Sequence, residues 1–370
     1  MKLVPKKILI ATKFFHPDIT PRSFRASELA KEFARQGHEV TVLTTERDFD
    51  YSELEKIHNF RVLATVKNEP NQIQGGGIKR IVRFVLQRLF YYPFILLSNK
   101  FSEALKKHTG YDLLVSIAHP FSVHFGVALA KKHNPNLCKT WVADCGDPFV
   151  GNGEGRLPVP FYFKWVESWF CKKPNFITIP IEDAKPAYPE NCQHKIKVIP
   201  QGFDFSEIRP NYEEGLNKMP TFAYAGMLGV GTRDPRPFLD MLCSLNQDFK
   251  FIVYTKNESL LEPYQKRLGN KLEVRSYVPR EQLLSVLGQM DFLINFENKS
   301  DVQKPSKLID YALLQRPTLS IKPFDINKVV LKEFLEGDYR HQIIIDDVSC
   351  FNIKNVTNKF LSLIKDDSKC

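Results

Sequence analysis

The stretch that decides the fold is KILIATKFFHPDITPRSFRASELAKEFARQGHEVTVLTT, residues 7–45. The apolar run within Lys7–Thr12 predicts a buried strand. After a loop, apolar residues recur at helical spacing from about Arg25 to Gln36, and Gly37 follows as a helix-ending residue. HEVTVLTT then predicts the next strand. A strand, a crossover helix and a second strand in so short a span form a parallel βαβ unit.

The same alternation continues along the chain. Further strands are predicted at 60–66, 113–117, 140–143, 175–179, 195–200, 221–225, 249–255, 272–277, 292–296 and 318–321. Helices are predicted at 122–133, 237–245, 280–288, 307–315 and 356–365. This order predicts an α/β protein with two Rossmann-like, doubly wound parallel-sheet domains that face a cleft. We place the first domain at 1–200, the second at 201–345, and a terminal helical segment that packs back on the first domain at 346–370.

Composition excludes several classes of protein. Of the 370 residues, 43% are hydrophobic and 25% charged, which is close to the average of globular proteins and unlike disordered, collagen-like or small disulfide-rich chains. The N-terminus lacks the long apolar region of a signal peptide. The seven cysteines are an odd number without a C-x-x-C pair, so we expect free thiols and a cytoplasmic protein.

The most apolar stretch is IKRIVRFVLQRLFYYPFILL, residues 78–97. Four basic residues and Pro93 interrupt it, and its uninterrupted apolar part is too short to span a bilayer. One interpretation is a peripheral surface that rests on anionic lipid headgroups. The other is a core helix whose arginines reach its edge.

A glycine-rich loop, GMLGVGTRDP at 226–235, follows the first strand of the second domain. Gly226 and Gly229 allow backbone N–H groups to approach a phosphate, and Arg233 can add a bidentate contact. The alternative is a tight turn without a ligand.

A second cluster surrounds the start of the helix predicted at 307–315. Lys304, Ser306 and Lys307 lie where the helix begins, and a cation there is unfavourable unless an anion is bound. Asp310, one turn further on, can accept two sugar hydroxyls. The alternative is an ordinary capped helix with surface charge.

Acidic residues follow the strand at 140–143. Asp144 and Asp147, in ADCGDPF, would face the cleft and act as a base or stabilise an oxocarbenium-like charge. Equally, both aspartates can hydrogen-bond backbone N–H groups of a turn. His119 also ends a strand, although a lone histidine is more often structural. Because no cluster has the spacing of a metal site, we expect neither a metal nor a cofactor.

Four segments resemble a known family: 7–45, IPQGFD at 199–204, FAYAGMLG at 222–229, and PSKLIDYALLQRPTLS at 305–320. Together they resemble bacterial glycosyltransferases of the GT-B fold, family 4, and in particular the branch that builds capsule and O-antigen chains. The resemblance implies retaining, metal-independent transfer of a sugar from a nucleotide-sugar, with the nucleotide in the second domain and the acceptor in the first.

The resemblance also implies roles for individual residues. Asp310 stands where the family's second acid binds the ribose, and Arg233 where a basic residue meets the diphosphate. A further group lies in the first loop, which in the family touches donor phosphates or acceptor: Arg22, Ser23 and Arg25.

Three departures stand out. Val302 occupies the place of the family's first acid, Met227 that of an arginine, and ADCGDP replaces the region of a histidine, so that Asp144 and Asp147 are the substitutes.

We therefore expect a glycosyltransferase at the inner face of the cytoplasmic membrane that extends a lipid-linked glycan for surface polysaccharide synthesis. One alternative is a nucleotide-sugar 2-epimerase of the same fold. The net charge of +10 and the pI of about 9.1 raise a second alternative, a nucleic-acid-binding protein. The basic residues do not gather in one motif, however, so we expect no nucleic-acid partner.

Overall fold

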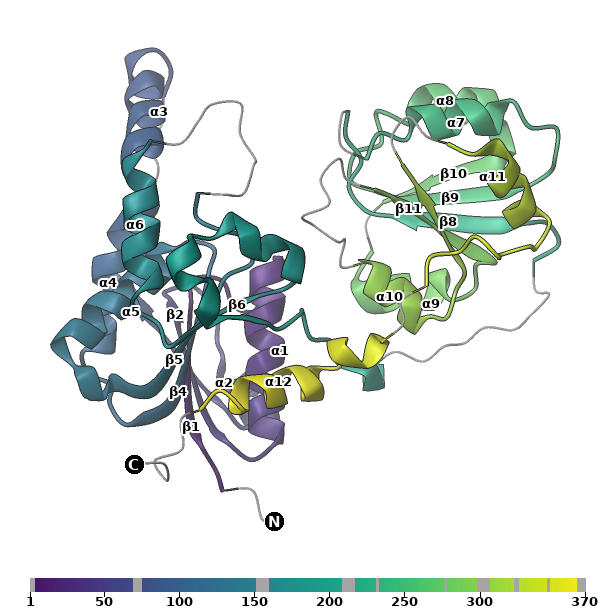
Figure 1. Cartoon of the computed structure of the whole chain (residues 1–370). Coiled ribbons are helices and arrows are strands. Elements are labelled where there is room, and N and C mark those ends of the chain that lie inside the picture. Colours follow the sequence, from purple (N-terminus) through teal and green to yellow (C-terminus); the bar gives the residue numbers. More distant parts are fainter. Residues whose placement is uncertain are drawn as a thin grey trace. The chain divides into compact units, whose positions relative to one another are not determined.

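The computed structural model describes residues 4–68, 75–150, 160–207, 217–230, 233–276, 278–297, 307–322, 326–344 and 347–364, without the side chains of Glu281 and Lys307. The chain forms two compact units (Figure 1): residues 1–203 with 351–370, called here the first unit, and residues 204–350, the second unit. Each has a parallel sheet with helices on both faces, which confirms the predicted fold class.

The sheet of the first unit has seven strands. Their spatial order is β3 (Arg61–Val66), β2 (Glu39–Thr45), β1 (Lys7–Thr12), β4 (Tyr111–Ile117), β5 (Cys138–Asp144), β6 (Phe176–Ile179) and β7 (Ile196–Val198). All neighbouring pairs are parallel. The order reverses direction between β1 and β4, and ligands in such sheets bind outside the carboxyl ends of the strands at this switch point.

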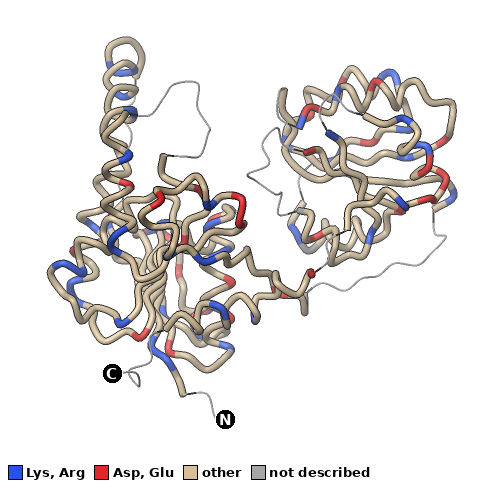
Figure 2. Tube along the Cα trace, in the orientation of Figure 1, with Lys and Arg blue, Asp and Glu red and all other residues tan. Residues whose placement is uncertain are grey.

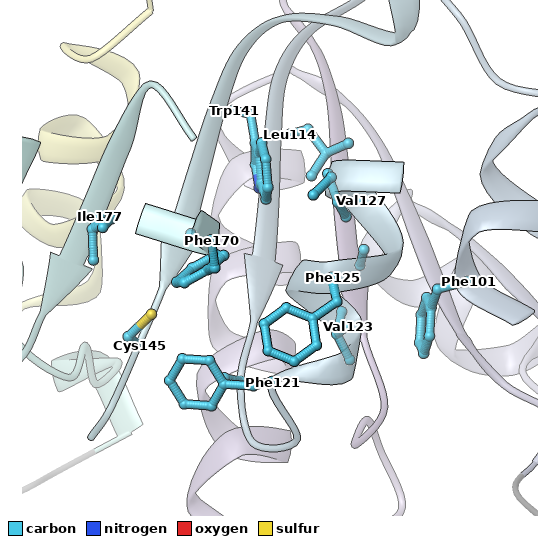
Figure 3. Packing of buried hydrophobic residues seen from close by; sticks show 14 of the residues in the cluster. Phe101, Leu114, Phe121, Val123, Phe125, Val127, Trp141, Cys145, Phe170 and Ile177 are labelled. Atoms are coloured by element: carbon cyan, nitrogen blue, oxygen red, sulfur yellow. The ribbon is translucent and has the colours of Figure 1, made fainter. Parts of the chain in front are cut away.

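Successive side chains along each strand point to opposite faces of this sheet. Ile8 and Ile10 of β1 pack against α1 (Pro21–Arg35) and α12 (Ile353–Leu361), with α2 (Ser52–His58) at the edge. Leu9 packs on the other face, which is covered by α4 (Leu97–Leu105), α5 (Ser122–His133) and α6 (Tyr162–Cys171). Figure 3 shows the centre of this second layer, where the rings of Trp141 of β5 and Phe170 of α6 lie among aromatic and aliphatic side chains.

The second unit repeats the plan with five strands. Their order is β10 (Leu272–Arg275), β9 (Lys250–Tyr254), β8 (Thr221–Ala225), β11 (Phe292–Phe296) and β12 (Thr318–Ile321). One face is covered by α7 (Arg236–Cys243), α8 (Glu262–Leu268) and α11 (Lys328–Leu335), and the other by α9 (Arg280–Leu287) and α10 (Lys307–Leu313). The switch point of this sheet lies between β8 and β11.

The first helix begins earlier than the sequence pattern predicts. Thr20 caps it by accepting a hydrogen bond from the Ser23 N–H at 3.1 Å, and Pro21 occupies its first turn. Proline suits that position because its missing N–H is not needed there. Our placement of Arg22, Ser23 and Arg25 in a loop is therefore wrong, since all three lie on α1.

The terminal helix α12 packs on α1 of the first unit. The rings of Phe33 and Phe360 meet edge to face at 6.5 Å, and the Gln36 side chain donates to the Thr357 hydroxyl at 2.8 Å. The chain thus returns to the first unit after completing the second.

Residues 78–97 do not form one helix. Helix α3 (Ile78–Phe90) ends at Tyr91, and after a short 3-10 turn, η1 (Phe94–Leu96), α4 continues into the core. Because no residue of α3 is buried, the core-helix interpretation is wrong for this part. Within the described parts of the chain, no single helix has the length and apolar character to cross a bilayer. One pair, Ile78–Phe90 with Phe94–Leu105, passes that test together but is bent by 52°.

Candidate functional site

The switch point of the first sheet gathers several of the predicted site residues. Lys13 follows β1, His119 follows β4 closely, and the segment 144–147 continues from β5. Because parallel strands end at the same edge, these side chains come together from three separate stretches of sequence. Lys13 is a residue that the sequence analysis missed, although its place directly after the first strand could have revealed it.

His119 lies in an aromatic pocket at this edge. Its Nδ1 is 3.4 Å from the Tyr91 hydroxyl, and its ring meets that of Phe94 edge to face at 5.3 Å. Burial lowers the pKa of His119, and the positive charges of Arg22 and Lys13 lower it further, while Asp147 opposes them. The imidazole is therefore neutral near pH 7 and able to accept a proton or a hydrogen bond.

Arg22 and Asp147 form the accessible part of the site. The Arg22 Nη2 is 3.8 Å from the Asp147 Oδ2, and the Asp147 side chain is 51% exposed. The guanidinium lies against Gly146, where a Cβ would come within 1.1 Å of Nη2. Glycine at this position thus leaves room for a cation beside a carboxylate at the mouth of the switch point.

Asp144 and Arg25 have a different role. They form a buried, bidentate ion pair with distances of 2.8 and 3.1 Å, and the Thr178 hydroxyl donates to the same carboxylate at 2.7 Å. Arg25 also donates to the carbonyls of Ile199 and Pro200. Burial would raise the pKa of Asp144, but Arg25 and Thr178 outweigh it and hold that pKa below its usual range. The pair fastens α1 to β5 and to the segment after β7.

Neither interpretation of Asp144 from the sequence matches this geometry. Its carboxylate is enclosed and faces a guanidinium, not an incoming hydroxyl or the N–H groups of a turn. Ser23 is likewise buried at the start of α1, where its N–H satisfies the helix cap.

Glu167 of α6 supports the segment that carries Asp147. Its Oε1 accepts hydrogen bonds from the N–H groups of Phe149 at 2.7 Å and Val150 at 3.3 Å. Burial raises the pKa of Glu167, although these two hydrogen bonds oppose the shift. The sequence analysis did not include α6, so this residue was missed.

The glycine-rich loop of the second unit leads into a hollow at the second switch point. Gly226 has a φ of +150°, a value that favours glycine. The carbonyl oxygen of the next residue, Met227, accepts a hydrogen bond from the Tyr224 hydroxyl at 2.8 Å. The hollow is small and is lined by Arg233, Asp234, Pro237, Phe296, Glu297, Ile321, Lys322 and Ile326.

This hollow combines charges of both signs. Arg233 and Lys322 provide cations, and Glu297 provides a carboxylate that also accepts from the Ser320 hydroxyl at 2.6 Å. Glu297 and Lys322 were missed from the sequence, although each directly follows a predicted strand. The Gly229 N–H lies 3.5 Å from the Arg233 carbonyl oxygen, and this contact connects the two sides of the glycine-rich loop.

Asp310 lies in the first turn of α10 and pairs with Arg280 at 2.6 Å. Burial raises the pKa of Asp310, and Arg280 opposes that shift. Its side chain keeps 20% exposure. The predicted partners Lys304 and Ser306, and the side chain of Lys307, lie outside the described residues.

Comparison with known proteins identifies the first unit. Residues 24–207 match the model of Glycosyltransferase Family 4. The chain carries a glycosyltransferase family 4 domain. The match contains His119, Asp144 and Asp147, whereas nearly all of the second unit lies beyond it. A search of curated proteins gives no match to this chain.

Solved structures similar to this chain cover both units. The lipopolysaccharide outer core galactosyltransferase WaaB, in its apo form, is 13% identical with a TM-score of 0.62 over 97% of this chain and 99% of its own. Anabaena Alr3699/HepE, in complex with UDP and glucose, is 11% identical with a TM-score of 0.61 over 96% and 98%. UDP-N-acetylglucosamine 2-epimerase from Rickettsia bellii is 12% identical with a TM-score of 0.53 over 97% and 96%. At these identities the likeness establishes the shared GT-B architecture.

Within the first unit, the structure separates the predicted site residues into two groups. His119, Arg22 and Asp147 meet at the switch point, while Arg25, Ser23 and Asp144 are buried in the scaffold beneath it. No cluster of three or more His, Cys, Asp or Glu side chains suited to a metal occurs in the described parts of the chain.

Proposed function

We propose that this protein is a retaining glycosyltransferase that moves a sugar from a nucleotide-sugar to a lipid-linked glycan acceptor during surface polysaccharide synthesis. The observation that carries the proposal is a family 4 domain whose switch point brings together His119, Arg22 and Asp147. The acceptor and its lipid would place the protein at the inner face of the cytoplasmic membrane.

The second unit would hold the donor. As the bond between sugar and phosphate breaks, negative charge develops on the leaving nucleoside diphosphate. Cations already in place where this charge develops lower the barrier, because they need not reorganise during the reaction. Arg233 and Lys322, which line the hollow of the second unit, suit this role, and Glu297 and Asp310 can accept hydrogen bonds from ribose or sugar hydroxyls.

The first unit would bind the acceptor and the reacting sugar. Asp147 is accessible and can accept a proton or a hydrogen bond from the acceptor hydroxyl. Neutral His119, beside it, can hydrogen-bond the transferred sugar without adding a positive charge near a forming oxocarbenium ion. Arg22 would orient the Asp147 carboxylate through their ion pair.

The proposal is tested by release of nucleoside diphosphate from a panel of UDP-, GDP- and dTDP-sugars with a bacterial lipid extract as acceptor. We expect one donor to react, and we expect release to depend on the extract. Asp147→Asn and His119→Ala should each lower kcat by about 10²-fold or more, the size typical of a lost acid–base or charge-stabilising group. Asp183→Asn, which changes an exposed acid elsewhere in the first unit, should leave kcat unchanged. Equal rates in all four proteins would contradict the proposed site.

A second candidate function is that of a nucleotide-sugar 2-epimerase, because the epimerase from Rickettsia bellii is similar to this chain in structure. An epimerase needs no acceptor. Incubation with donor alone, followed by NMR of the sugar, separates the two: an inverted C2 centre supports the epimerase, and an unchanged donor supports the transferase.

A further inference from the structure

Helix α3 projects from the first unit (Figure 1), and the described parts of the chain leave all of its residues unburied. Side chains three or four residues apart share one helical face, and here that face is apolar. Its members are Ile78, Ile81, Val82, Val85 and Leu89, with exposed fractions between 39% and 79%. An apolar stripe of this kind on a solvent-facing helix marks an interaction surface.

Helix α6 lies beside α3 and adds aromatic side chains. The Tyr162 hydroxyl donates a hydrogen bond to the Leu89 carbonyl, which joins the two helices. Phe161 and Trp165, whose rings meet at 5.3 Å, are 69% and 68% exposed, and Trp169 is 39% exposed. Exposed tryptophan is costly in water but favoured at the boundary between headgroups and acyl chains.

The exposed charges that α3 and α6 themselves carry are all positive. Residues 78–97 contain four basic residues and no acidic residue: Lys79, Arg80, Arg83 and Arg88. Lys164 adds a cation on α6, whose single acid, Glu167, is buried against backbone N–H groups. Figure 2 shows the basic positions repeating along α3. Such a surface complements an anionic bilayer and would repel a second copy of itself.

We propose that α3 and α6 together form a docking surface for anionic membranes, with the α3 stripe and the rings of Phe161 and Trp165 in the headgroup boundary. The surface requires no transferase activity, so it can be tested without any substrate. It differs from the expectation of a single segment at 78–97, because the aromatic side chains of the proposed surface come from α6, some seventy residues further along the chain.

Both helices are tied to the loops of the first-unit site. The Tyr91 hydroxyl, at the end of α3, accepts from the Phe121 N–H at 3.2 Å and lies 3.4 Å from His119. Glu167 of α6 holds Phe149 and Val150, which follow Asp147 closely. A membrane-bound α3–α6 pair would therefore hold this site close to the bilayer, within reach of an acceptor carried by a lipid.

The test is flotation of the full chain with vesicles of phosphatidylcholine alone or with one quarter phosphatidylglycerol. We expect binding to the anionic vesicles only. Ile81→Glu should weaken it at least tenfold, whereas Ile57→Glu, on α2 of the same unit, should not, because the two side chains have matched exposures of 64% and 65%. Equal binding by both variants would overturn the proposal. Far-UV circular dichroism confirms that both variants are folded.

Two further experiments separate the contributions of the basic residues and of the aromatic rings to vesicle binding. Lys79→Gln with Arg80→Gln should weaken binding about 25-fold, since each basic residue near an anionic surface contributes roughly a factor of five. The control pair, Lys107→Gln with Lys132→Gln, should bind as the wild type. Brominated lipids should quench tryptophan fluorescence, and Trp165→Phe should remove most of the quenching. A dimer that dissociates in Ile81→Glu, without vesicle binding by the wild type, would show that a second copy covers this face and would overturn the proposal.

Discussion

Two arginines on consecutive turns of α1 have opposite environments. Arg25 is enclosed with Asp144 and two backbone carbonyls, while Arg22 reaches the exposed Asp147. The sequence predicted that all of these residues gather near one site, but not which of them are buried. Burial of Arg25 depends on the carbonyls of Ile199 and Pro200, which lie about 175 positions away, and no local pattern encodes that contact.

Arg25→Ala should destabilise the first unit by about 3–5 kcal/mol, because it leaves the Asp144 carboxylate buried without its partner. Arg22→Ala should cost less than about 1 kcal/mol, since its ion pair is partly exposed, but should reduce sugar transfer. Urea unfolding followed by tryptophan fluorescence measures the first unit selectively, because all three tryptophans belong to it: Trp141, Trp165 and Trp169. Equal stability losses in the two variants would contradict the assignment.

The burial of His124 predicts that the first unit loses stability as the pH falls. Its ring is fully buried between the Ser116 hydroxyl at 2.8 Å and the Cys145 thiol at 3.4 Å, and burial lowers its pKa to about 3. The unfolded chain binds a proton near pH 6.5, so stability is fully present above that pH and is lost as the pH falls from 6.5 toward 3, by at most about 1.4 kcal/mol per unit.

His124→Asn should remove this part of the pH dependence. The free energy of unfolding should fall less steeply between pH 6 and pH 4 in the variant than in the wild type, as measured by urea titrations at each pH. Parallel curves for the two proteins would show that His124 does not titrate in this way.

At the scale of elements, strongly periodic segments were predicted well and exposed or aromatic-rich ones poorly. Helices α5 and α9 appear close to their predicted bounds, because an apolar face packs on the sheet. Helix α6 was missed because aromatic residues occupy half of its positions, on more than one face, so no helical period stands out. The start of α1 was misplaced because Thr20 and Pro21 were interpreted as loop residues, whereas Thr20 caps the helix and Pro21 lies in its first turn.

Glu167→Ala should loosen the segment after Asp147, since the N–H groups of Phe149 and Val150 lose their acceptor. We expect a loss of about 1–3 kcal/mol and faster hydrogen exchange at Phe149 and Val150. Glu167→Gln should retain both, because an amide oxygen accepts the same bonds, and burial disfavours the charge in any case. Exchange rates that are alike in Glu167→Ala and the wild type would contradict this role.

At the scale of the whole molecule, the sequence predicted two doubly wound sheets, and the strand orders confirm them. The order of strands follows from the crossover rules of parallel sheets, so this level was accessible from periodicity alone. The hollow of the second unit was not, because it combines side chains that follow β8, β11 and β12 and depends on how these strands align.

The division into units predicts separable unfolding. Phe360 of α12 and Phe334 of α11 are both almost fully buried, but in the first and second unit respectively. Each change to alanine should cost about 3–5 kcal/mol in its own unit. In calorimetry, Phe360→Ala should lower the transition that coincides with the tryptophan signal, and Phe334→Ala should lower the other. A shift of both transitions in either variant would show that the units unfold as one.

The central claim, that this chain transfers a sugar, is tested most directly by mass spectrometry of the lipid-linked acceptor. After incubation with the reacting nucleotide-sugar, the account predicts an acceptor heavier by one sugar residue, with the anomeric configuration of the donor retained in its NMR spectrum. This product should be absent with Asp147→Asn. A donor that is hydrolysed or epimerised while the acceptor keeps its mass would contradict the account.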